Sequence, residues 1–128
     1  MPTPIETVRE FIAAFIAAWP HGDPSRLGPF FREDAVYHNV PMEPVNGREA
    51  ILATFADFMS MGGQVGVDIT RIVADGAIVM TERVDHFIGE RTSISLPLMG
   101  IIEVHDGAIT AWRDYFDINQ LTAPPSRQ

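Results

Sequence analysis

Residues 77–117 read AIVMTERVDHFIGERTSISLPLMGIIEVHDGAITAWRDYFD, and β-branched and aromatic residues recur through them with a period of two. Together with the segment before them, they divide into four β-rich runs, residues 65–73, 77–88, 92–105 and 108–117. Turn signals that contain glycine separate these runs, at Asp75-Gly76, Gly89-Glu90 and Asp106-Gly107. Because turns this short join antiparallel strands, the four runs predict an antiparallel meander.

The N-terminal segment has helical spacing up to Trp19. Thr3 and Glu6 have the spacing of a capping box, and Pro4 stands in the first turn. Apolar residues then recur every three or four positions, which predicts an amphipathic helix. Pro20 is expected to end it.

Three further elements are predicted between this helix and the meander. They are a short helix over residues 23–27, a strand over residues 35–40 and a helix that begins at Asn46 and ends at Gly62-Gly63. Asn46 is expected to cap the last helix, with Glu49 three residues on as its partner.

Helices followed by hairpins are typical of an α+β fold. We expect a long curved sheet whose one end is closed by the early helices, so that the domain forms a cone with an apolar interior. The period of the strands leaves open whether this interior is a solid core or a ligand cavity.

The composition predicts one acidic domain over residues 1–128. There are 17 Asp and Glu against 9 Lys and Arg, a formal net charge of −8, so a nucleic-acid partner is not expected. The absence of cysteine excludes disulfides, thiol catalysis and cysteine-ligated zinc. No metal is expected, because the four histidines lack metal-ligand spacing: His21, His38, His86 and His105.

The apolar stretch FIAAFIAAW, residues 11–19, does not predict a membrane segment. It is too short to span a bilayer. Glu6 and Glu10 flank Arg9 where a signal peptide would carry its positive region. We therefore expect a cytoplasmic protein without membrane insertion.

Polar residues on the inward face of the strands are the candidates for chemistry. Residues two apart on a strand share a face, so Arg83 and Asp85 lie together. Asp114 shares its face with Trp112 and Phe116 in the same way. The bulky apolar neighbours of both carboxylates indicate that these carboxylates point toward the interior.

Arg83 has the geometry to bridge Asp85 and Asp114 with its planar donor fork. Two carboxylates held close together push their acidities apart, which leaves one as a base and the other as an acid. The alternative is a structural salt bridge, which an Arg-x-Asp pattern on a strand also fits. Tyr37 and Asn39, which share a face of their strand, are either part of the site or a half-buried pair.

Three motifs together resemble the limonene-1,2-epoxide hydrolase family. They are Tyr37-x-Asn39-x-Pro41, Thr81-Glu82-Arg83-Val84-Asp85 and Trp112-Arg113-Asp114-Tyr115-Phe116-Asp117. Each motif alone is weak, but their order and spacing match over nearly the whole chain. The resemblance implies an NTF2-like cone, a homodimer and an active site deep in the cavity that uses no cofactor.

The resemblance also implies a role for each polar residue. Asp114 would be the general base and Asp85 the general acid, with Arg83 linking the two carboxylates. Tyr37 and Asn39 would join Asp114 in holding the nucleophilic water. Water would then open the epoxide to a vicinal diol in one step, without a covalent intermediate.

This chemistry agrees with the residues themselves, because an epoxide needs acid assistance at its oxygen as much as base assistance at water. An apolar wall is expected from Phe58, Phe87, Leu96, Leu98, Trp112 and Phe116, which could equally be plain core. If they line a cavity, they favour a hydrophobic epoxide, cyclic or lipid-like, as the partner of water.

Two other functions stay open. A ketosteroid-isomerase-like or polyketide-cyclase-like enzyme also places carboxylates and a tyrosine in an apolar cone. The bridging Arg83 favours proton relay to water over carbanion chemistry, which requires an oxyanion hole. A non-catalytic module that binds a small ligand would keep the same charges in structural pairs.

Overall fold

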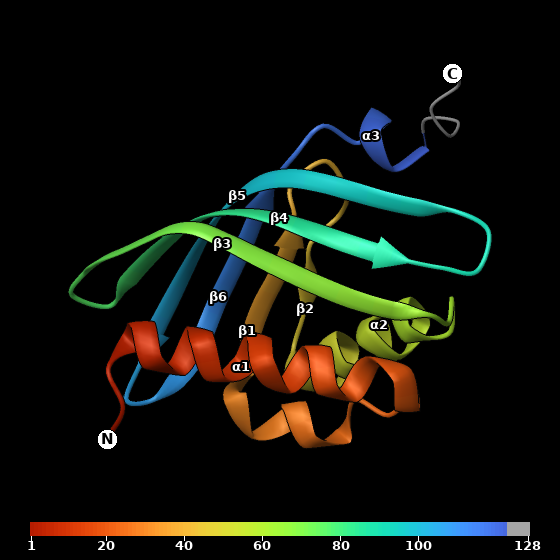
Figure 1. Cartoon of the computed structure of the whole chain (residues 1–128). Helices are drawn as coiled ribbons and strands as arrows, with labels where there is room; N and C mark the ends of the chain where they lie inside the picture. Colours follow the sequence, from red (N-terminus) through yellow and green to blue (C-terminus); the bar gives the residue numbers. More distant parts are fainter. Residues whose placement is uncertain (123–128) are drawn as a thin grey trace.

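The computed structural model describes residues 1–122, in which helices cover one face of a six-stranded sheet (Figure 1). The helices are α1 (Pro4–Ala18), α2 (Arg48–Met59) and α3 (Asn119–Thr122), with 3-10 turns η1 (Trp19–His21) and η2 (Ser25–Phe30). The strands are β1 (Phe31–Asn39), β2 (Val45–Asn46), β3 (Gln64–Asp75), β4 (Ile78–Ile88), β5 (Ser93–His105) and β6 (Ala108–Tyr115). The predicted domain extends to residues 123–128, which lie outside the described residues.

The predicted meander is confirmed, because β3 to β6 pair antiparallel in chain order. The full strand order is β2-β1-β6-β5-β4-β3, and β1 runs parallel to β6, so the sheet is mixed. Register shifts interrupt the ladder at Ile69/Arg71 in β3 and at Glu103/Val104 in β5. Such irregularities bend strands, which curves the sheet around the helices.

Helix α1 forms as its sequence predicts. The Thr3 hydroxyl accepts a hydrogen bond from the Glu6 backbone N–H at 3.1 Å, and the Glu6 carboxylate accepts one from the Thr3 N–H at 2.8 Å. The inner face of α1 packs on the sheet through Phe11, whose ring centroid lies 5.2 Å from those of Phe31 and Trp112. This aromatic core fixes the helix across the concave face of the sheet (Figure 1).

The predicted start of the last long helix is wrong. Asn46 lies in β2, opposite Val36, and the helix begins at Arg48 with Gly47 as an N-cap that makes no side-chain hydrogen bond. The reason is tertiary, because the Gly47 N–H donates to the carbonyl of Ala35 at 2.7 Å and ties this junction to β1. Pairing with β1 therefore outweighs the local capping preference of Asn46.

Other boundaries also differ from the sequence prediction. Strand β1 begins at Phe31 rather than at Ala35, and the short β2 and α3 were not anticipated. None of the helices described over residues 1–122 combines the length and the apolar character needed to cross a membrane.

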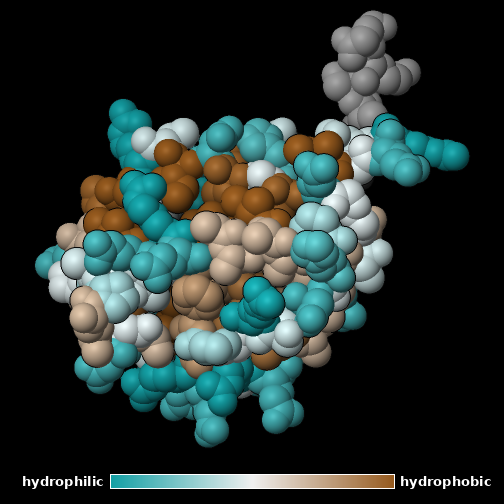
Figure 2. All heavy atoms as spheres, turned by 60° about the horizontal axis from the view of Figure 1, so that its bottom comes forward, coloured by the Kyte–Doolittle hydropathy of each residue, from teal (hydrophilic) through white to brown (hydrophobic). Residues whose placement is uncertain are grey.

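Apolar side chains also reach the outer face of the sheet, the face that the helices leave open. Val73, Met80, Met99 and Tyr115, from four adjacent strands, are 60%, 43%, 46% and 50% exposed, and we call them the outer-face stripe. Val73 pairs with Met80 across β3 and β4, and Met99 pairs with Tyr115 across β5 and β6. Figure 2 brings the bottom of Figure 1, where α1 lies, toward the viewer, and on the visible face hydrophobic residues gather in the upper part and hydrophilic ones along the lower edge.

Candidate active site

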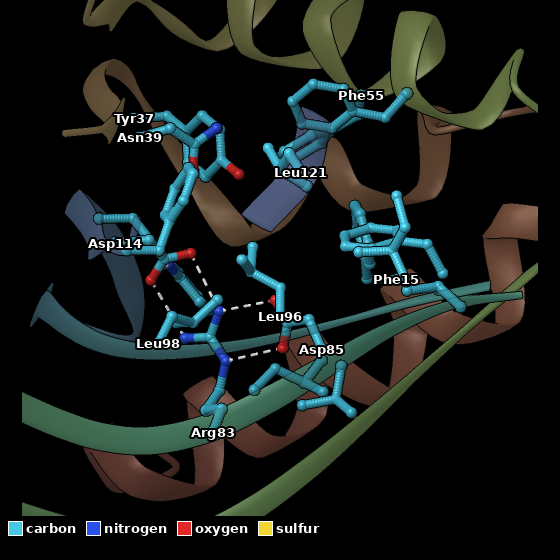
Figure 3. Close-up of a pocket in the computed structure, with 18 of the residues that line it drawn as sticks. Phe15, Tyr37, Asn39, Phe55, Arg83, Asp85, Leu96, Leu98, Asp114 and Leu121 are labelled. Carbon is cyan, nitrogen blue, oxygen red and sulfur yellow. Dashed lines mark hydrogen bonds and ion pairs between the residues drawn. The ribbon is translucent and has the colours of Figure 1, made fainter. Parts of the chain in front are cut away.

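Arg83 lies between two carboxylates in the interior, as the strand periodicity predicts (Figure 3). Within β4, Arg83 Nε donates to Asp85 Oδ1 at 3.2 Å and Arg83 Nη2 donates to Asp85 Oδ2 at 3.1 Å. Toward β6, Nη1 donates to Asp114 Oδ1 at 3.1 Å and Nη2 donates to Asp114 Oδ2 at 2.9 Å. The guanidinium therefore makes a two-point contact with each carboxylate.

Thr81 takes the remaining N–H of this arginine. Nη1 of Arg83 donates to the Thr81 hydroxyl at 3.1 Å, and the Thr81 side chain is buried. A guanidinium has five N–H donors, and each of these five hydrogen bonds uses one of them. The orientation of Arg83 is thus fixed on every side.

Trp112 holds Asp114 from the other side. Its indole Nε1 donates to Asp114 Oδ1 at 2.9 Å, and the centre of the Arg83 guanidinium lies 5.6 Å from its ring centroid. Asp114 therefore accepts three hydrogen bonds, two from Arg83 and one from Trp112. The sequence prediction treated Trp112 only as apolar wall, and its polar contact was missed.

Burial governs the electrostatics of the cluster. The side chains of Arg83, Asp114 and Asp85 are 4%, 6% and 15% exposed. Desolvation raises the pKa of Asp85 above its ordinary value, although the charge and hydrogen bonds of Arg83 act in the opposite direction. Burial lowers the pKa of Arg83, but the charges of Asp114 and Asp85 outweigh it and leave this pKa above its ordinary value. The cluster thus pairs a permanent cation with a carboxyl that retains its proton more readily than usual.

Tyr37 and Asn39 line the same cavity from β1, on the side nearer Asp114 (Figure 3). Parallel pairing of β1 with β6 places Tyr37 opposite Trp112 and Asn39 opposite Asp114. Burial, and then the charge of Asp114, raise the pKa of the Tyr37 phenol above its ordinary value. Tyr37 therefore keeps its proton and can donate a hydrogen bond.

The interior is a cavity of about 400 Å³ rather than a solid core. All eleven predicted site residues line it: Tyr37, Asn39, Phe58, Arg83, Asp85, Phe87, Leu96, Leu98, Trp112, Asp114 and Phe116. The polar groups gather at one end of this lining, and the rest of the wall is apolar (Figure 3). The cavity falls in the size range of small-molecule sites.

Ten further residues line the cavity that were not predicted from the sequence. Helices α1 and α2 contribute Phe11, Ile12, Phe15 and Phe55, and other segments add Met42, Met61, Val65, Val67, Ile94 and Leu121. Helical spacing marked Ile12, Phe15 and Phe55 as apolar, but nothing local distinguishes a residue that faces a cavity from one that fills a core. Within residues 1–122, no group of three or more His, Asp or Glu side chains could hold a metal ion.

Comparisons with known proteins find similar sequences. A model of the limonene-1,2-epoxide hydrolase (LEH) catalytic domain matches residues 2–127. The chain is 39% identical over 114 residues to epoxide hydrolase EphG of Mycobacterium tuberculosis. The aligned part covers 86% of this chain and 73% of that protein.

Solved structures give the same result for the fold. An LEH-like epoxide hydrolase of M. tuberculosis has a TM-score of 0.69 at 36% identity, covering 88% of this chain and 84% of that chain. An NTF2-like protein of unknown function from Cytophaga hutchinsonii has a TM-score of 0.73 at 18% identity, covering 95% of this chain and 96% of that one. This last likeness shows the fold alone, and the predicted NTF2-like α+β fold is confirmed.

Proposed function

The chain belongs to the limonene-1,2-epoxide hydrolase family, and we propose that it adds water to a hydrophobic epoxide in one step to give a vicinal diol. The observation that carries this proposal is the pair of carboxylates joined by one fully bonded arginine at the polar end of an apolar cavity. Proton donor and proton acceptor are then held in a fixed relation to the same bound molecule.

Asp85 is the general acid and Asp114 the general base. The raised pKa of Asp85 supports its role, because an acid must still hold its proton when the substrate binds. Asp114 accepts three hydrogen bonds from its neighbours, which is the pattern of an ionised carboxylate. With one proton between the two carboxyl groups, Arg83 leaves the cluster neutral, which suits an apolar cavity.

The water is held by Asp114, Tyr37 and Asn39. As the water oxygen bonds to an epoxide carbon, the carbon–oxygen bond of the ring breaks and Asp85 protonates the departing oxygen. Asp114 takes the proton that the attacking water loses. After the diol leaves, a proton returns from Asp114 to Asp85 and the site is reset.

The apolar wall supports a neutral, hydrophobic epoxide, cyclic or lipid-like, as the substrate. Apart from the cluster and its water-holding residues, the cavity is lined by aliphatic, aromatic and methionine side chains. Binding therefore draws on burial of apolar surface, while the cluster orients the epoxide. The chemistry asks for no metal and no cofactor.

Diol formation from a panel of epoxides tests the proposal. The panel contains limonene oxide, cyclohexene oxide, styrene oxide and a fatty-acid epoxide, and Asp114→Asn is assayed beside the wild type. We expect diol from the wild type and at least a ~10²-fold lower turnover in the variant, which loses its proton acceptor. No diol from a wild type that melts cooperatively would overturn the proposal and favour the isomerase, cyclase or binding functions.

A single turnover in ¹⁸O-labelled water tests the absence of a covalent intermediate. If water attacks the epoxide directly, the first diol formed carries the label. Label that enters only in later turnovers would show that a carboxylate oxygen of Asp85 or Asp114 had attacked first.

We also propose that the chain forms a homodimer through the outer-face stripe. Its apolar side chains are about half exposed in the single chain. Covering them against a second copy would remove this apolar surface from water. The stripe is on the opposite face of the sheet from the cluster, so the dimer leaves the cavity free.

A further inference from the structure

Gly100 lies in β5 between the two strands that carry the catalytic groups. It pairs with Thr81 of β4 on one side and with Asp114 of β6 on the other. Its neighbours two positions away, Leu98 and Ile102, have buried side chains on the inner face. A side chain at position 100 would therefore point toward the interior as well.

The space that such a side chain would occupy is already filled. A Cβ atom built on Gly100 would lie 2.6 Å from Asp114 Oδ1, 2.7 Å from Arg83 Nη1 and 3.0 Å from Thr81 Oγ1. Ordinary contacts of this kind begin at 3.4 Å, so even a methyl group would overlap the carboxylate by about 0.8 Å. The backbone at Gly100 has no left-handed φ, so the need for glycine here is one of space.

The three crowded atoms are joined by hydrogen bonds on the side of Arg83 that faces Asp114. Nη1 of Arg83 donates to both Asp114 Oδ1 and Thr81 Oγ1, and all three meet above the Gly100 backbone. We infer that Gly100 is a positioning residue: its missing side chain leaves the slot in which the Arg83 guanidinium meets Asp114. Its role in catalysis rests on the proposed function, but its role in placing the ion pair does not.

A substitution in this slot would act on the site more than on the fold. The two closest atoms, Asp114 Oδ1 and Arg83 Nη1, are at the ends of their side chains, so the overlap is relieved first by moving these ends rather than the backbone. The movement would fall on the base and on the arginine that orients it. A misplacement of about 1 Å at a reacting group can cost about 10²-fold in rate.

Gly100→Ala tests the inference, with Gly66→Ala as the matched control. Gly66 also lies within a strand of this sheet and has no left-handed φ, but a Cβ there would meet only the Cβ of His86, at 3.9 Å. We expect kcat for diol formation to fall by at least about 10²-fold in Gly100→Ala while KM changes little, because the nearest atoms to the new Cβ belong to the polar cluster and to Thr81 and not to the apolar wall. Gly66→Ala should behave as wild type.

Two further measurements keep the inference testable. The first, on Thr81 variants, serves if Gly100→Ala folds poorly, and the second, by ¹⁵N spectra, serves if the wild type forms no diol. Thr81→Val removes the acceptor of the fifth N–H of Arg83, and Thr81→Ser keeps it, so kcat should fall further in the valine variant. In ¹⁵N spectra, the fully bonded Arg83 guanidinium should give separate, slowly exchanging Nη–H signals in wild type and Gly66→Ala. These signals should be lost in Gly100→Ala and broadened in Thr81→Val.

The outcomes separate the two proposals. An active wild type whose Gly100→Ala variant keeps full kcat and unchanged Nη–H signals would overturn the role of Gly100. A wild type that forms no diol, with Nη–H signals that are present and then lost in Gly100→Ala, would overturn the proposed function but support the positioning of the ion pair. If the Nη–H signals of Arg83 are absent in the wild type, the guanidinium is not held against Asp114 above Gly100, and the inference is overturned.

Discussion

Asp85 has a pKa above its ordinary value, because burial disfavours its charged form. This shift makes the stability of the protein depend on pH. In the unfolded chain this carboxyl loses its proton at lower pH than in the folded chain. Between the two pKa values the folded state therefore binds more protons, and the free energy of unfolding falls as pH rises through that interval. The stabilisation that Asp85 contributes is complete below its unfolded pKa and is lost as pH rises through its folded pKa.

Urea unfolding of wild type and Asp85→Asn from about pH 4 to about pH 8 measures this effect. The amide has no proton to lose, so the difference in unfolding free energy, wild type minus variant, should decrease as pH rises. Titrating groups outside the cluster of Arg83, Asp85 and Asp114 are common to both proteins and cancel in the difference. A difference that stays constant, or that increases with pH, would contradict the raised pKa and weaken the role of Asp85 as the acid.

At the scale of elements, the junction between β2 and α2 depends on Gly47. Its φ of 95° and ψ of 146° belong to a region that residues with a Cβ rarely adopt. A Cβ there would lie 3.6 Å from the Glu33 carbonyl oxygen, an ordinary contact, so the cost of a side chain is conformational. Gly47→Ala should lower the free energy of unfolding by about 1–3 kcal/mol.

Denaturant unfolding of Gly47→Ala beside Gly66→Ala checks this value. Gly66 has no left-handed φ, and a Cβ there would make only one ordinary contact. Its substitution should therefore change stability little. Equal stability of the two variants would mean that the junction tolerates an ordinary residue.

For the whole molecule, the prediction concerns the outer-face stripe. Met80→Glu and Met99→Glu each place a charge in the centre of the proposed interface, where burial of a charge is costly. Light scattering should find a dimer for the wild type and a monomer for these variants. Met61→Glu is the control, because Met61 is also an exposed methionine, at 68%, but lines the cavity instead of the stripe. A wild-type monomer, or dimers of all three variants, would exclude this interface.

Much of this molecule follows from local sequence. The capping box at Thr3 and Glu6, the meander from β3 to β6 and the inward direction of Arg83, Asp85 and Asp114 all depend on period and turn chemistry. These features repeat over a few residues, so neighbouring positions suffice to predict them. The resemblance added the NTF2-like fold and suggested the roles that we propose for residues that separate strands bring together.

Tertiary structure alone decided what depends on the spacing between distant segments. Pairing of β1 with β6 put Asn39 beside Asp114, and the tie from Gly47 to Ala35 moved the start of α2. Whether the interior was core or cavity depended on how α1, α2 and the sheet enclose the space between them, and periodicity within one element does not contain that information. Gly100 shows the same limit, because its sequence position reads only as a glycine within a strand. Its importance comes from atoms of three adjacent strands that compete for one small space.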